Sequence, residues 1–348
     1  MRKHYLDNIR IIIILMLFPY HAFMIWNNYG TKFYVWGGDN NILSSLIVLV
    51  GPWFMPILFV IAGMSARLSL QKRNTKDFIK ERITKILIPF ICGVVLLIPF
   101  QTLYARKFFF GYSGSIIDNF IYFFTHFSDL NGYDGMFTFG HLWFLLYLFL
   151  ISLVSLLMFK LLSFDKADKV LSKMNIFITM LLFIPIFIMY NIGNFGGQSI
   201  GKYLLLFLLG YYLFTDKFID KIVKYKYLIL PIFIISEIVL VILFYINGFY
   251  NDLYVNFVGW FGILSCLIIG KLFLNKENKI TNYFKNASFP IYILHQTILV
   301  ILGYYSLVHL NNIYLQLLII IFGSFIITII FYEIIKRIPI IRNMIGIK

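Results

Sequence analysis

The chain has 348 residues, of which 61% are hydrophobic and 13% charged, and its mean hydropathy is +0.86. Soluble domains carry about a quarter charged residues and under half apolar ones, so this composition excludes a soluble globular protein. The net charge of +15 comes from basic residues in short loops between apolar stretches. This placement favours contact with anionic lipid headgroups, and we expect no nucleic-acid partner.

Ten apolar stretches approach the length of a membrane-spanning helix, about 20 residues. In chain order they are Ile11–Trp26, Ile42–Met64, Ile83–Leu103, Leu142–Leu162, Ile176–Ile192, Ile200–Phe214, Tyr227–Ile246, Tyr254–Leu274, Phe289–Val308 and Ile313–Ile335. The first stretch lacks a small-residue cleavage site, so we interpret it as a retained span and not as a signal peptide. The sequence therefore predicts an all-α polytopic membrane protein, a bundle of about ten helices forming one integral-membrane domain over residues 1–348.

The distribution of charge supports ten spans with both termini in the cytoplasm. This topology leaves only four of the 30 Lys and Arg outside, namely Lys32, Arg106, Lys107 and Lys202. Such a bias in short loops is typical of plasma-membrane proteins. The longest extracytoplasmic loop is residues 104–140. Its apolar part, Ile116 to Phe127, is too short to span, and we expect it to lie in the interface or to fold over the mouth of the bundle.

Ionisable residues at membrane depth are costly and suggest a function. Arg10 and His21 in the first span are eleven residues apart, close to three helical turns, so both face the same way about 16 Å apart. Asp7 lies on the same side, and Pro19 should kink the helix before His21. The structural alternative is that Arg10 extends to the inner headgroups and His21 is a packing residue.

Two further groups lie at the ends of spans. Arg82 and Lys85 share a helix face where the third span enters the bilayer, and they suit a phosphate-rich cytoplasmic ligand. Plain positive-inside charge is the alternative explanation. His141 and Trp143 open the fourth span at the outer surface, where an interfacial aromatic belt accounts for Trp143.

The last spans hold polar residues at depth. His295 should reach the middle of the membrane in the ninth span, with Tyr292 on nearly the same face. Glu237 lies at mid-depth in the seventh span, and Glu333 lies near the inner end of the tenth. For both glutamates a structural ion pair explains the position as well as catalysis does.

One short motif is rejected. The pentapeptide Gly197-Gln198-Ser199-Ile200-Gly201 matches the G-x-S-x-G nucleophile elbow, which needs a strand that turns into a helix. We see no strand pattern, so Ser199 is not expected to be a nucleophile. His126 and His141 lack the ligand spacing of a metal site, and we expect no bound metal.

Five motifs in order resemble the integral-membrane acyltransferase 3 family, and most of all its glucan biosynthesis protein C branch, whose members succinylate periplasmic glucans. Ala62 stands where the family usually has Ser, and Lys85 stands where it more often has Arg. The motifs are Tyr5-Leu6-Asp7-Asn8-Ile9-Arg10 through Pro19-Tyr20-His21, Leu58-Phe59-Val60-Ile61-Ala62-Gly63, His141-Leu142-Trp143-Phe144-Leu145, Asn286-Ala287-Ser288 with Tyr292 and His295, and Tyr332-Glu333-Ile334 with Arg337-Ile338-Pro339.

The resemblance implies an O-acyltransferase that moves an acetyl or succinyl group from cytoplasmic acyl-CoA to a hydroxyl of an extracytoplasmic carbohydrate or envelope polymer, without a permanently bound cofactor. It identifies Arg10 and His21 as the essential pair, and Arg82 and Lys85 as the basic motif that binds acyl-CoA. We hypothesise that neutral His21 is the general base, although it could instead carry the acyl group covalently.

His295 is the second candidate near the thioester. Further candidates for substrate contacts are Asp7, His141, Trp143, Tyr292 and Glu333, and acceptor contacts in the outer loop could come from Tyr122, Phe123, Phe124, Asp129 and Asp134. The competing hypotheses are a multi-span transporter or flippase of an envelope precursor and a structural or sensory membrane protein. Inverted repeats, which are frequent in transporters, are not visible in the sequence.

Overall fold

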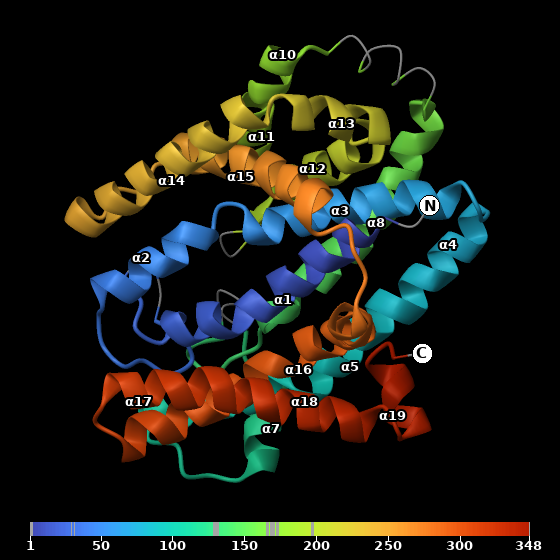
Figure 1. Ribbon diagram of the computed structural model, residues 1–348. Coiled ribbons are helices and arrows are strands. Elements are labelled where there is room, and N and C mark those ends of the chain that lie inside the picture. Colours follow the sequence, from blue (N-terminus) through green and yellow to red (C-terminus); the bar gives the residue numbers. More distant parts are fainter. Residues whose placement is uncertain are drawn as a thin grey trace. The chain divides into compact units, whose positions relative to one another are not determined.

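The computed structural model describes residues 3–28, 30, 32–127, 132–164, 167, 171, 174–195 and 198–347 (Figure 1). The first half contains α1 (His4–Met24), α2 (Asn41–Val50), α3 (Phe54–Leu70), α4 (Thr75–Arg82), η1 (Ile83–Leu87), α5 (Ile88–Leu96), α6 (Ile98–Phe110), α7 (Ile116–Thr125), η2 (Gly140–Leu142) and α8 (Trp143–Leu161). The second half contains α10 (Ile176–Met180), α11 (Phe183–Tyr190), β1 (Asn194–Phe195), β2 (Gln198–Ser199), α12 (Ile200–Tyr212), α13 (Asp216–Lys224), α14 (Lys226–Asn247), α15 (Asp252–Phe273), α16 (Lys279–His309), α17 (Ile313–Leu318), η3 (Ile319–Gly323), α18 (Ser324–Ile335) and α19 (Pro339–Met344).

Eight helical stretches of the described chain are long and apolar enough to cross a membrane. They are His4–Met24, Asn41–Leu70, Thr75–Phe110, Gly140–Leu161, Lys226–Asn247, Asp252–Phe273, Lys279–His309 and Ile313–Ile335, and each overlaps a predicted span. The fifth and sixth predicted spans correspond to shorter apolar helices, Ile176–Tyr190 and Ile200–Tyr212. The all-α membrane architecture is confirmed, whereas ten crossings and cytoplasmic termini stay predictions.

Two predicted spans are interrupted at prolines. The second divides into α2 and α3 around Pro52, and the third divides into α5 and α6 just before Pro99. Proline has no N–H to donate and clashes with the preceding turn, so a helix breaks or bends there. Pro19, by contrast, lies inside the continuous α1.

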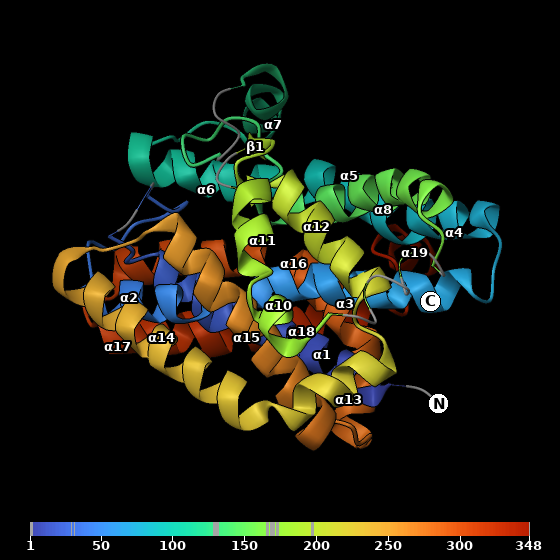
Figure 2. The same ribbon diagram turned by 90° about the horizontal axis from the view of Figure 1, so that it is seen from above.

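The chain divides into two compact units. The first unit comprises Met1–Ile13, Val48–Ile83 and Tyr147–Asn278. Within it α3 lies against α12, and α14 runs beside α15 (Figures 1 and 2). Glycines allow the close approach of α3 and α12, because a Cβ on Gly63 would overlap the carbonyl of Phe207 and a Cβ on Gly210 would overlap that of Val60.

The second unit comprises Ile14–Ile47, Thr84–Leu146 and Lys279–Lys348. Its long helix α16 packs against α6 and α18. A buried apolar cluster, which includes Trp26, Phe33, Tyr34 and Val300, joins the end of α1 and the following loop to α6 and α16.

A small β-hairpin corrects the expectation that the chain has no strand. β1 and β2 pair antiparallel, and Ser199 closes β2 directly before α12. Ser199 is 1% exposed, donates to the carbonyls of Met189 and Ile192, and accepts from the N–H of Lys202. A hydroxyl in these roles is an N-cap that stabilises the helix start, so the rejection of Ser199 as a nucleophile agrees with its contacts. Gly197 lies outside the described residues.

Candidate functional site

The first helix carries two of the predicted site residues. Arg10 lies in the part of α1 that belongs to the first unit, and His21 lies in the last turns of α1, which belong to the second. We describe the surroundings of each within its own unit.

Arg10 is held by three groups of the first unit. Its guanidinium donates to Asp7 Oδ1 at 3.3 Å, to Ser65 Oγ at 2.5 Å and to the carbonyl of Ile61 at 3.4 Å. The side chain of Arg10 keeps 36% of its surface exposed. It is therefore oriented by fixed partners and still accessible to a ligand, an arrangement for which the planar guanidinium is well suited.

Arg82 ends α4 in the same unit. Its guanidinium lies 4.5 Å from the ring centre of Phe78, and its Nε is buried without a hydrogen-bond partner among the residues that the structure describes. Glu81 and, more weakly, Arg10 and Arg73 act electrostatically on Arg82. Lys85 follows in the π-helical segment η1, so the α-helical spacing used to place it on the face of Arg82 does not hold.

Three histidines meet in the second unit. The ring centres of His21 and His295 are 5.3 Å apart, and those of His295 and His141 are 5.0 Å apart. His295 is fully buried and His141 is 6% exposed, whereas His21 is half-buried. The structure thus groups two predicted catalytic residues with His141, which the sequence suggested only as a substrate contact.

Hydrogen bonds define the tautomers of the two buried rings. His295 Nδ1 lies 2.7 Å from the carbonyl of Tyr292, and His141 Nε2 lies 3.0 Å from that of Ile293. A carbonyl only accepts, so each of these nitrogens carries the proton. The remaining nitrogens, His295 Nε2 and His141 Nδ1, then present lone pairs and have no hydrogen-bond partner in the described part of the chain, where His21 Nδ1 is also buried without one. Tyr292 also links the two histidine segments through its side chain, because its hydroxyl donates to the backbone carbonyl of His141.

A buried amide network next to His295 in the chain was missed by the sequence analysis. Gln296 donates to Gln101 Oε1 at 3.0 Å, and Gln101 donates to Thr297 Oγ1 at 2.8 Å. The signal was present in the sequence, since His295-Gln296-Thr297 is a polar run inside an apolar span. Gln296 Oε1 accepts no hydrogen bond from any residue that the structure describes.

Aromatic residues of two loops lie next to His21. Phe33 stacks on the imidazole with ring centres 5.9 Å apart, and Phe33, Tyr34 and Tyr133 contact one another at 5.1–5.8 Å. Burial raises the pKa of Tyr34 well above its ordinary value, so its hydroxyl stays protonated. The sequence analysis missed this group because Tyr133 is 99 positions from Tyr34 in the chain.

The acceptor residues predicted from the outer loop lie elsewhere. Phe123 is fully buried, and Tyr122 lies against Arg106 with 4.0 Å between the guanidinium carbon and the ring centre. Phe124 and Asp134 are exposed, and Asp129 lies outside the described residues.

The remaining candidates have structural partners. Glu333 accepts from the Tyr283 hydroxyl at 2.9 Å and pairs with Lys336 at 2.5 Å, so both of its oxygens are engaged. Trp143 is half-buried and packs edge-on against Phe144. Glu237 is 4% exposed, and neither of its carboxyl oxygens has a hydrogen-bond partner among the described residues. Within the described ranges, no group of three or more His, Cys, Asp or Glu is arranged to hold a metal ion.

Comparison with protein families gives one match. The acyltransferase domain model of the acyltransferase 3 family matches residues 3–333. No curated protein and no solved structure matches the chain. The family predicted from the five motifs is confirmed, and because the match covers nearly the whole chain, the protein belongs to the acyltransferase 3 family and is a membrane acyltransferase.

Proposed function

We propose that the protein transfers an acetyl or succinyl group from cytoplasmic acyl-CoA to a hydroxyl of an extracytoplasmic carbohydrate or envelope polymer, as in the glucan biosynthesis protein C branch. The observation that carries the proposal is the group formed by His21, His295 and His141, in which each ring has a nitrogen without a partner. Buried imidazoles with available lone pairs are suited to general base catalysis.

The donor site is proposed at Arg10 and Arg82. Guanidinium groups bind phosphates through charge-assisted hydrogen bonds, so the phosphates of coenzyme A suit Arg10 and Arg82, which lie in the same unit. Asp7, Ser65 and Ile61 hold Arg10 in one orientation, which supports a fixed contact with a phosphate. Lys85 is the third cation proposed for this ligand.

In the proposed reaction, His21 takes the proton of the acceptor hydroxyl while the hydroxyl oxygen attacks the thioester carbonyl. The C–S bond then breaks, an ester forms, and the thiolate of coenzyme A receives the proton. The His21 imidazolium carries N–H groups at both ring nitrogens, and its Nδ1–H can donate to the lone pair on His295 Nε2. His295 is thus a positioning residue that stabilises the protonated base, and the ring of His141 packs edge-on against His295.

The acceptor is proposed to reach His21 beside Tyr133. Phe33 and Tyr34 are buried, whereas Tyr133 is half-buried and contacts Phe33, which stacks on His21. An accessible aromatic ring next to the base suits the apolar face of a sugar.

The test is an acyl-transfer assay with detergent-purified protein. Loss of thioester from acetyl-CoA and succinyl-CoA is measured with and without an envelope carbohydrate extract, for the wild type and the variants Arg10→Ala and His21→Ala. We expect one donor to turn over only with the extract. His21→Ala should lower kcat by about 10²–10⁴-fold, the usual contribution of a general base.

The matched control is His309→Ala, because His309 lies at the exposed end of α16, the helix that carries His295. Full transfer by a folded His21→Ala protein contradicts the role of His21. Absence of both turnover and binding of either CoA ester by folded wild-type protein contradicts the donor.

A further inference from the structure

An apolar groove separates α4 from α8, two helices that are neighbours in both ribbon views (Figures 1 and 2). Its apolar walls are formed by Ile79 of α4 and by Leu153, Val154, Leu156 and Leu157 of α8, which all belong to the first unit. The groove has a volume of about 380 Å³. A cavity of about 150 Å³ is enough for a benzene molecule, so the groove has room for a longer apolar group.

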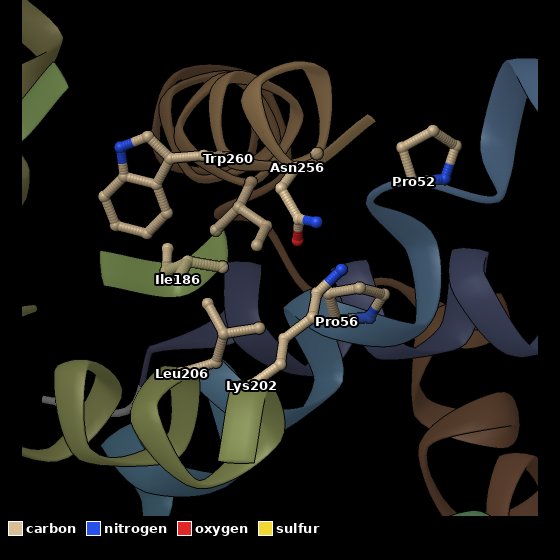
Figure 3. Close-up of a pocket in the computed structure, with 9 residues that line it drawn as sticks. Pro52, Pro56, Ile186, Lys202, Leu206, Asn256 and Trp260 are labelled. Atoms are coloured by element: carbon tan, nitrogen blue, oxygen red, sulfur yellow. The ribbon is translucent and has the colours of Figure 1, made fainter. Parts of the chain in front are cut away.

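Another hollow of the same unit lacks such room. Figure 3 shows Lys202 of α12 and Asn256 of α15 beside it, with mostly apolar side chains in the rest of the wall. Between the described residues this hollow leaves no space for even one water molecule. The groove, in contrast, is large enough for a ligand.

The groove is open towards the bilayer. α8 belongs to the apolar stretch Gly140–Leu161, which is long enough to span a membrane. Leu157 and Val154 line the groove and are still 63% and 44% exposed. Open apolar surface on a spanning helix is in contact with lipid tails, which are as apolar as leucine. An acyl chain is therefore the apolar group that can enter the groove from its open side.

The polar residues of the groove lie at the membrane surface. Lys160 is in the last turn of α8, and it lines the groove together with Thr75, the first residue of α4. Leu153 is seven residues earlier in α8, ~10 Å along the helix axis and nearer the middle of the span. A ligand thus meets polar groups at the surface and apolar walls below them. A phospholipid in one leaflet has this arrangement of headgroup and chain.

The charge at the surface end favours an anionic headgroup. Among the described residues Lys160 forms no ion pair, and neither does Lys76, which is exposed and follows Thr75. Asp77 is two positions after Thr75, about 200° around the helix, so it faces away from the groove. Lysines at a membrane surface attract anionic lipids. A zwitterionic lipid leaves this positive charge unbalanced.

We propose that the groove between α4 and α8 binds an anionic phospholipid, with one acyl chain along Ile79, Leu153 and Leu157 and the phosphate at Lys160 and Thr75. The ammonium of Lys160 and the hydroxyl of Thr75 can both donate to phosphate oxygens. The walls of the groove include none of the residues proposed for acyl transfer, so the proposal is independent of that chemistry.

The test is native mass spectrometry of the full-length protein in an uncharged detergent, titrated with phosphatidylglycerol or with phosphatidylcholine of the same acyl chains. We expect saturable binding of phosphatidylglycerol with the lower Kd. Lys160→Met keeps an apolar stem and should weaken phosphatidylglycerol binding by about fivefold, the effect of one lysine at a membrane surface, without changing phosphatidylcholine binding. Leu157→Trp fills the groove and should weaken the binding of both lipids.

The matched controls are Lys224→Met and Leu161→Trp. Lys224 is an exposed lysine of the same unit, and Leu161 is 79% exposed on α8 but does not line the groove. Neither control should change lipid binding. Equal Kd values of the wild type for the two lipids, or unchanged phosphatidylglycerol binding in Lys160→Met or in a folded Leu157→Trp protein, overturns the proposal. Palmitoyl-CoA that displaces the phospholipid at a lower concentration and is itself lost in Leu157→Trp assigns the groove to the chain of an acyl donor and also overturns it.

Discussion

The ring nitrogens of His295 have different partners, and this difference determines its proposed role. Nδ1 is tied to the Tyr292 carbonyl, whereas Nε2 is left as an acceptor. We predict that His295→Phe lowers kcat by about tenfold, equivalent to ~1.4 kcal/mol of lost transition-state stabilisation, and leaves the KM for acyl-CoA unchanged. Because His295 is proposed to act through His21, the double variant His21→Ala/His295→Phe should be no slower than His21→Ala alone. If the double variant instead loses steady-state rate by the product of the two single losses, His295 has a role that is independent of His21.

Tyr133 is the accessible member of the aromatic group next to His21. If the acceptor lies on its ring, Tyr133→Ala should raise the KM for the acceptor several-fold while the KM for acyl-CoA stays the same. The comparison variant is Tyr314→Ala, because Tyr314 is 79% exposed on α17 of the same unit. Initial rates with varied acceptor at saturating donor measure the effect, and equal KM values for the two variants would exclude Tyr133 from the acceptor site.

Close packing between α3 and α12 depends on two glycines. A side chain at Gly210 would overlap the backbone carbonyl of Val60, which can move only with its helix. We predict that Gly210→Val lowers the Tm of the detergent-purified protein by several degrees, since overpacking of a tight contact costs about 1–3 kcal/mol. Gly323→Ala serves as the comparison, because its Cβ would meet side-chain atoms and no backbone, namely Leu302 Cδ1 at 3.3 Å and Ile319 Cγ2 at 3.9 Å. Equal melting curves for the two variants would contradict the tight contact.

At the scale of elements, the sequence located features that depend on local pattern. Every helix long enough to span overlaps a predicted span. The apolar run from Ile116, predicted to be too short to span, forms the ten-residue helix α7. Interruptions inside spans were missed, because hydropathy averages over the break at Pro52. The β-hairpin was missed because each strand has only two residues, too few for an alternating pattern.

At the scale of the whole molecule, prediction of the site depended on sequence distance. Arg10 and His21 share one helix, so helical geometry was enough to relate them. The contact between His141 and His295 joins segments that are more than 150 positions apart, and no periodicity encodes such a pair. The family motifs contain both residues, but only the tertiary structure shows that they group with His21, Phe33 and Tyr133.

The number of membrane crossings depends on two short helical stretches. Ile176–Tyr190 and Ile200–Tyr212 extend about 20 Å each, less than the ~30 Å hydrocarbon core. Charge does not decide between the two topologies, because only Lys202 changes sides when neither stretch crosses. The segment between the two stretches discriminates. With ten crossings the exposed Asn191 faces outwards, and with eight it faces the cytoplasm.

We predict that Asn191→Cys, in a protein whose Cys92 and Cys266 are replaced by alanine, reacts with a membrane-impermeant maleimide in intact cells. Ser113→Cys should react in the same way, and Lys276→Cys should react only after permeabilisation, because these two exposed positions lie on opposite sides whether eight or ten spans cross. If Asn191→Cys follows Lys276→Cys, the two short helices do not cross as a pair and the protein has eight spans. In that case Lys202 lies on the cytoplasmic side, where it adds to the basic residues that orient the chain.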